Sequence, residues 1–185
     1  MSAPICDAVV RRLTFIWDGG TVPSIDIHMI RLLIIGFGNP LRCDDALGWH
    51  IAQELLRGPI PDDVQVVAAH QLTPEMSEVA SRAEHVLFVD AARHGDPGSM
   101  ECDLLESDAS PIRYTHELSP SIVLKLAKEL YGRSPAAHLL TIAGESFETG
   151  EAMSSRVRAA IPALVARIRR FVDGEREWTG RADSD

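Results

Sequence analysis

The stretch "IIGFGNPLRCDDALG" (residues 34–48) decides the fold class, because an apolar run passes through two closely spaced glycines into a helical pattern. The run "MIRLLIIGF" (29–37) is rich in Ile and Leu and is typical of a buried strand. The segment "DALGWHIAQELLRG" (45–58) places apolar residues four positions apart, which predicts a helix. A strand that leads directly into a helix is the repeating unit of α/β folds.

The same alternation continues along the chain. We expect further strands at 64–69, 85–92, 100–106 (an edge strand) and 137–144, and further helices at 73–83, 119–132 and 153–172. This order predicts a mostly parallel sheet with helices on both faces, in a single α/β domain that covers residues 29–173. We expect residues 1–28 to be an extension outside the core, disordered or due to a misassigned start, and residues 174–185 to be a polar tail.

Composition excludes several classes of protein. The 185 residues carry a net charge of −9, which argues against nucleic acid and against an anionic membrane as partners. No apolar run reaches the length of about 18 residues that a membrane-spanning helix needs. The three cysteines form no Cys-x-x-Cys pair and no disulfide framework, which predicts a reducing, cytoplasmic location. Cys43 is a possible nucleophile, but a small half-buried filler is favoured, because the sequence places no base beside it.

The glycine turn does not fit a nucleotide site. A dinucleotide fingerprint needs a glycine three residues after Gly38, and Leu41 stands there; no Gly-Lys-Ser/Thr follows either. Asp44 and Asp45 would also repel a phosphate. The turn instead brings a carboxylate to the start of a helix, where the helix dipole keeps it ionised. Asp44 alone is best interpreted as a helix cap, and Asp45 as either a dipole partner or a ligand.

Other polar residues fall at the same predicted edge of the sheet. In parallel sheets, ligands bind at the carboxyl ends of the strands. Asp90 ends the buried run "VLFV", where an acid needs a partner, and His116 lies in "THELSP" just before a helix. Two carboxylates and an imidazole suit a borderline metal such as nickel, zinc or iron. Taken singly, Asp90 could equally be a buried, satisfied acid, and His116 an ordinary loop histidine.

Four segments carry a family resemblance: "GFGNPLRCDDALG", "VLFVDAA", "THELSP" and "GESFETGEAMS", in this order. Over residues 30–172 the chain resembles the hydrogenase maturation proteases. The resemblance implies a three-layer αβα sandwich with a mostly parallel central sheet of about five strands. It also implies a metal-contacting trio, which falls on Asp45, Asp90 and His116. Ala46 departs from the family pattern, because a glycine is common at that position.

The resemblance further implies an activity. Members are endopeptidases that remove a carboxy-terminal extension from the large-subunit precursor of nickel-iron hydrogenases after nickel has been inserted. The precursor is then the partner, and its nickel is what the trio recognises. No metal is bound permanently, although other divalent metals can occupy the site in vitro. Gly38 and Asn39 are candidates for holding polar groups of the substrate.

The chemistry of cleavage has fewer sequence signals. The chain has no His-Glu-x-x-His motif, and its spacings indicate no Ser-His-Asp arrangement. The available mechanism for cutting the peptide bond is a carboxylate that activates water, with a metal polarising the carbonyl. Asp45 or Asp90 is the candidate base. Two alternatives stay open: a non-catalytic partner that checks the precursor for nickel, and an αβα hydrolase with another substrate.

Overall fold

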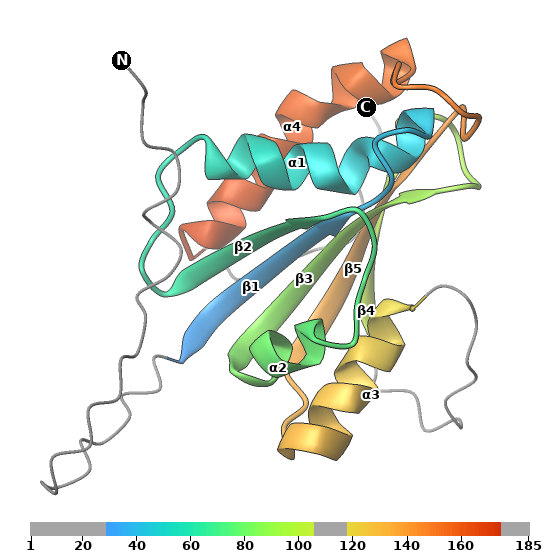
Figure 1. Cartoon of the computed structure of the whole chain (residues 1–185). Coiled ribbons are helices and arrows are strands. Elements are labelled where there is room, and N and C mark those ends of the chain that lie inside the picture. Colours follow the sequence, from blue (N-terminus) through green and yellow to red (C-terminus); the bar gives the residue numbers. More distant parts are fainter. Residues whose placement is uncertain (1–28, 106–117, 175–185) are drawn as a thin grey trace, which may run out of the picture.

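The computed structural model describes residues 29–105 and 118–174, which form one sheet with helices on both faces (Figure 1). The strands are β1 (Ile30–Phe37), β2 (Val64–Ala69), β3 (Ala83–Ala92), β4 (Met100–Leu105) and β5 (Ala136–Ala143). The helices are the 3-10 helix η1 (Cys43–Ala46), α1 (Leu47–Leu56), α2 (Met76–Ser81), α3 (Pro120–Tyr131) and α4 (Ser155–Val172). The predictions for residues 1–28 and for 175–185 lie outside the described residues.

The sheet has the order β2-β1-β3-β5-β4. The first four strands in this order run parallel, and β4 pairs with β5 in the antiparallel sense at the edge. This arrangement confirms the predicted mostly parallel sheet and the predicted edge strand. Among the described helices, none combines the length and the apolar character needed to cross a membrane.

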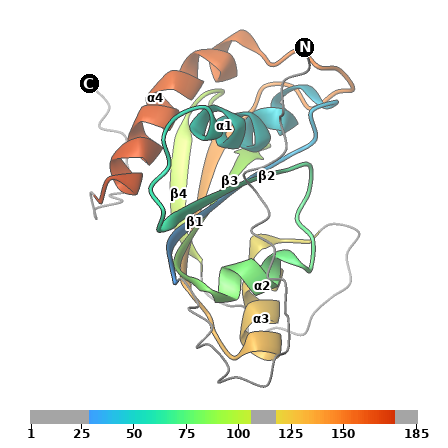
Figure 2. The same cartoon turned by 60° about the vertical axis from the view of Figure 1, so that its left-hand side comes forward.

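Helices cover the two faces of the sheet in pairs (Figure 2). Helices α1 and α4 bury Leu47, Ile51, Leu164 and Ile168 against one face. Helices α2 and α3 bury a second apolar cluster, which includes Ala80 and Val123, against the other face. Two separate cores on one sheet make the predicted three-layer αβα sandwich.

Helix α1 packs against the sheet through Gly48. A Cβ atom added at Gly48 would lie 2.1 Å from the backbone oxygen of Val89 and 2.4 Å from that of Phe37. Glycine therefore lets the first turn of α1 approach β1 and β3. As a result, the start of the helix lies at the carboxyl edge of the sheet.

Helices α1, α2 and α4 begin later than the sequence pattern predicts. The segment expected to be helical from residue 45 enters α1 through η1. The predicted helix 73–83 is the shorter α2, because residues 73–75 form a turn in which the amide of Met76 donates to the carbonyl of Thr73. Apolar periodicity reports the buried face and carries little information about where the backbone becomes helical.

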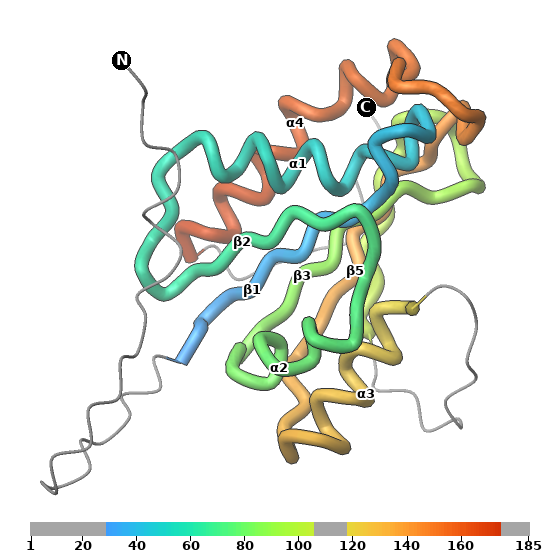
Figure 3. The backbone as a smooth tube through the Cα atoms, viewed as in Figure 1, coloured from blue at the N-terminus to red at the C-terminus, as the bar shows by residue number. Residues whose placement is uncertain are grey.

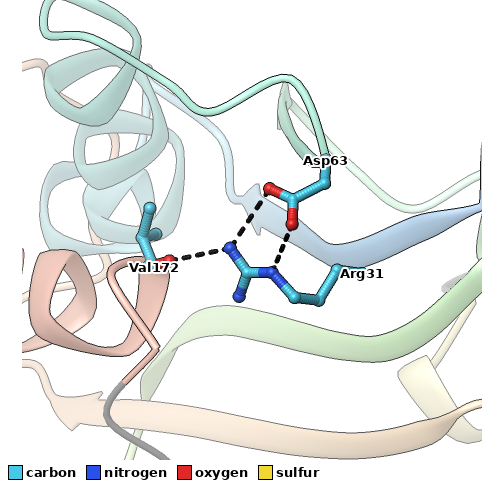
Figure 4. Close-up of polar contacts among 3 residues, drawn as sticks. All are labelled: Arg31, Asp63 and Val172. Atoms are coloured by element: carbon cyan, nitrogen blue, oxygen red, sulfur yellow. Dashed lines mark hydrogen bonds and ion pairs between the residues drawn. The ribbon is translucent and has the colours of Figure 1, made fainter.

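At the other end of the sheet, where β1 begins, Arg31 joins the segment before β2 to the end of α4 (Figure 4). Arg31, near the start of β1, donates to the Asp63 carboxylate at 2.6 Å and to the backbone oxygen of Val172 at 2.8 Å. The second bond satisfies a carbonyl at the end of α4, which has no partner within the helix. This contact anchors the last helix far from the strand ends where ligands are expected.

Candidate functional site

Three connections gather where β1, β3 and β5 end (Figure 3). They are residues 38–46 after β1, residues 93–99 after β3 and residues 144–154 after β5. Because these strands are parallel neighbours, their carboxyl ends share one edge of the sheet. This is the edge at which the sequence predicts the site.

The turn after β1 depends on Gly38. Its φ of +142° is rarely adopted by residues with a side chain, and an added Cβ would lie 1.7 Å from the backbone oxygen of Asp45. The side-chain oxygen of Asn39 accepts a hydrogen bond from the amide of Leu41 at 2.9 Å and closes the turn. Gly38 and Asn39 therefore shape the site, whatever they contribute to substrate binding.

Asp45 projects back over this turn. Its Oδ2 accepts a hydrogen bond from the amide of Asn39 at 3.0 Å, and its side chain is half-buried. Within the described residues, Oδ1 accepts no hydrogen bond. One carboxylate oxygen thus fixes the side chain over the turn.

Asp44 has a different environment from its neighbour, and its predicted role as a helix cap is wrong. The side chain is 0% exposed and makes no capping hydrogen bond to η1. It accepts hydrogen bonds from the amides of Glu145 at 2.8 Å, Ser146 at 2.9 Å and Ser154 at 2.7 Å, and from the Ser154 hydroxyl at 2.8 Å. The carboxylate turns away from its own helix because the loop after β5 offers it more donors.

These donors also control the ionisation of Asp44. Burial is the largest single influence and by itself would raise the pKa of the carboxyl group. The hydrogen bonds from Ser146, Glu145 and Ser154 act in the opposite direction and together lower the pKa below its usual value. Asp44 is therefore a buried anion held by backbone amides.

Asp90 lies near the end of β3, at the same edge as Asp45. Gly36 of β1 pairs with Val89, so Asp90 is level with the point where β1 enters the glycine turn. The side chain is half-buried, and its Oδ1 accepts a hydrogen bond from the amide of Ala91 at 2.8 Å. The structure thus places Asp90 near the carboxyl end of β3 and Asp45 in η1, which follows the neighbouring parallel strand β1.

The third predicted member, His116, lies outside the described residues. In residues 29–105 and 118–174, no group of three or more His, Cys, Asp or Glu side chains is arranged to hold a metal ion. The metal-contacting trio therefore stays a prediction, with two of its carboxylates at one sheet edge.

The sequence pattern did not reveal how the loop 144–154 joins the site. The amide of Cys43 donates to the backbone oxygen of Gly150 at 2.7 Å, and Arg42 donates to that of Phe147 at 3.2 Å. The guanidinium of Arg93 lies 4.4 Å from the centre of the Phe147 ring, a cation–π contact. These partners are about 50 to 110 residues apart in the chain, and no local spacing signals them.

Comparisons with known proteins find a likeness to hydrogenase maturation proteases. The hydrogenase 2 maturation protease of Escherichia coli strain K12 is 29% identical over 94 residues, which are 49% of this chain and 56% of that protein. The chain thus matches little more than half the length of this curated relative. No protein-family model matches the chain.

Solved structures extend the likeness over most of the domain. A NiFe hydrogenase maturation protease, HycI of Thermococcus kodakarensis, is 26% identical with a TM-score of 0.64, covering 78% of this chain and 93% of its own. The hydrogenase maturating endopeptidase HybD of E. coli is 25% identical with a TM-score of 0.66, covering 83% and 99%. In both sequence and fold, the chain is therefore similar to the hydrogenase maturation proteases.

Proposed function

We propose that this protein is a cytoplasmic endopeptidase that removes a carboxy-terminal extension from the large-subunit precursor of a nickel-iron hydrogenase after nickel insertion. The observation that carries the proposal is the position of Asp45. Its carboxylate is fixed through one oxygen at the carboxyl edge of the sheet, beside the strand that bears Asp90. The fold around it is that of hydrogenase maturation proteases.

In this proposal Asp45, Asp90 and His116 recognise the nickel that the precursor presents. Carboxylate oxygens and an imidazole nitrogen form a mixed donor set that suits a borderline divalent metal. With no permanently bound metal, the residues would engage only when metal and peptide arrive together. Two weak contacts made at once give specificity that neither gives alone.

The same carboxylates supply a base for hydrolysis. Asp45 or Asp90 takes a proton from water as the water oxygen bonds to the scissile carbonyl carbon. When the carbon–nitrogen bond breaks, the proton passes to the leaving amine and the carboxylate is restored. Asn39 is well placed to orient the peptide, because its side-chain NH2 group donates to none of the described residues.

The test is the intact mass of a nickel-loaded precursor after incubation with the full-length protein. The wild type should remove a carboxy-terminal peptide, and Asp90→Asn should abolish the loss of mass. Asp103→Asn is the matched control, because Asp103 is an exposed acid in the middle of β4, and this variant should cleave normally. Binding of the precursor without any change in mass would refute the protease and favour the nickel-checking partner.

A further inference from the structure

Asp44 is a fully buried carboxylate that the proposed chemistry does not use. We propose that Asp44 is a positioning residue, which holds Asp45 in place by clamping the turn 41–46 to the loop 144–154. The inference rests on the proposed function for the role of Asp45. The clamp itself rests on hydrogen bonds between the two segments.

The carboxylate of Asp44 joins both ends of the loop. Oδ2 accepts from the amides of Glu145 at 2.8 Å and Ser146 at 2.9 Å, at the start of the loop. Oδ1 accepts from the amide of Ser154 at 2.7 Å, at the end of the loop. The Ser154 hydroxyl adds a bond to Oδ2 at 2.8 Å. Charged hydrogen bonds of this kind are stronger than neutral ones, and here they are shielded from water.

Backbone hydrogen bonds reinforce the clamp on either side. The amide of Asp44 donates to the Ser146 oxygen at 3.0 Å, and the amide of Cys43 donates to the Gly150 oxygen at 2.7 Å. The amide of Gly150 donates in return to the Leu41 oxygen at 2.9 Å. Cys43 has a φ of +47°, an uncommon conformation for a residue with a side chain. The loop therefore stabilises a backbone conformation that the turn would not favour alone.

The position of Asp45 depends on these hydrogen bonds. It follows Asp44 directly in η1, and its own amide donates to the Arg42 oxygen at 3.0 Å. The strand β3 lies between β1 and β5, so the clamp crosses the end of the strand that carries Asp90. Loosening the clamp should thus move Asp45 relative to Asp90, even though Asp44 itself is fully buried.

Amide hydrogen exchange of the full-length Asp44→Asn variant tests the inference. Exchange at residues 145, 146 and 154 should accelerate, because their acceptor is weakened. The positioning role predicts that exchange at Asn39, whose amide bonds to Asp45, also accelerates by about tenfold. Amides of Ile34 and Ile35 in the core of β1 should stay protected, which separates this effect from global unfolding.

Two further variants keep the test decisive. Ser154→Ala removes one donor and leaves the charge, so it should show the same pattern more weakly if Asp44→Asn fails to fold. Asp45→Asn should accelerate exchange at Asn39 and leave residues 145, 146 and 154 protected. Unchanged exchange at Asn39 in both clamp variants, with the loop amides deprotected, would overturn the positioning role.

Cleavage kinetics add a second readout. Asp44→Asn should lower kcat for the precursor with little change in KM, because the residue aligns a catalytic group and does not bind the peptide. The exchange experiment needs neither precursor nor nickel. A chain that cleaves no precursor but shows the coupled exchange would refute the proposed function and keep the clamp.

Discussion

Gly38 shows, at the scale of one residue, how a missing side chain sets the geometry of the site. The turn brings the backbone of residue 38 against the backbone oxygen of Asp45, and a methyl group cannot fit there. The glycine that first suggested a nucleotide-binding turn therefore serves the placement of a carboxylate.

Gly38→Ala should destabilise the protein by roughly 3 kcal/mol, because steric overlap adds to the cost of an unfavourable backbone conformation. Gly132→Ala is the matched control. Gly132 also has a positive φ, of +71°, but nothing lies within 4 Å of its added Cβ, so only the backbone cost of about 1 kcal/mol applies. Urea denaturation measures both, and equal losses of stability would contradict the steric account.

Asp44 and Asp45 mark the limit of sequence reasoning at this scale. Side by side in the sequence, they are chemically identical, and helix-start rules apply to both. The structure buries Asp44 under the loop 144–154 and leaves Asp45 half-buried over the turn. The difference arises from donors about 100 residues away, which local patterns do not contain.

At the scale of elements, β5 carries a histidine whose environment affects stability. Burial lowers the pKa of His138, and the nearby His85 on β3 lowers it further by charge repulsion. Burial likewise lowers the pKa of His50 on α1. Both groups favour the neutral form in the folded protein, so the unfolded chain binds protons more readily.

The free energy of unfolding should therefore be highest above the unfolded histidine pKa of about 6.5 and should fall as the pH drops below it. His138→Gln should weaken this dependence, and His50 should keep part of it in the variant. Thermal unfolding of both proteins between about pH 7.5 and pH 5 measures the effect. An identical pH dependence in the variant would show that His138 does not contribute.

Element types followed from the sequence more readily than element ends. The Ile- and Leu-rich run that became β1 carries a strong local signal, and so does α3. A Ser-Pro pair is typical of a helix start, and Ser119 accepts a hydrogen bond from the amide of Ile122 at 3.4 Å. The start of α2 carries no such signal. Thr73 is a residue type that often caps helices, but here it lies in the turn before α2.

At the scale of the whole molecule, topology explains why the sequence could predict which residues share the carboxyl edge of the sheet. Parallel strands bring their carboxyl ends to one edge, so the sequence could place Asp45 and Asp90 at that edge. Their joint role as metal ligands came from the family resemblance and stays a prediction. The loop 144–154 could not be assigned its clamping role, because which loop contacts which turn depends on packing. His116 stays a prediction, since it lies outside the described residues.

The central proposal is that carboxylates at this edge recognise the nickel in the precursor and take part in removing its carboxy-terminal extension. The most direct test is the single-turnover cleavage rate of nickel-loaded and nickel-free precursor, by wild type and by Asp45→Asn. The wild type should cleave the loaded precursor selectively, and Asp45→Asn should lower that rate by about a hundredfold or more. Cleavage by Asp45→Asn at the wild-type rate, or equal cleavage of both precursors by the wild type, would contradict the account.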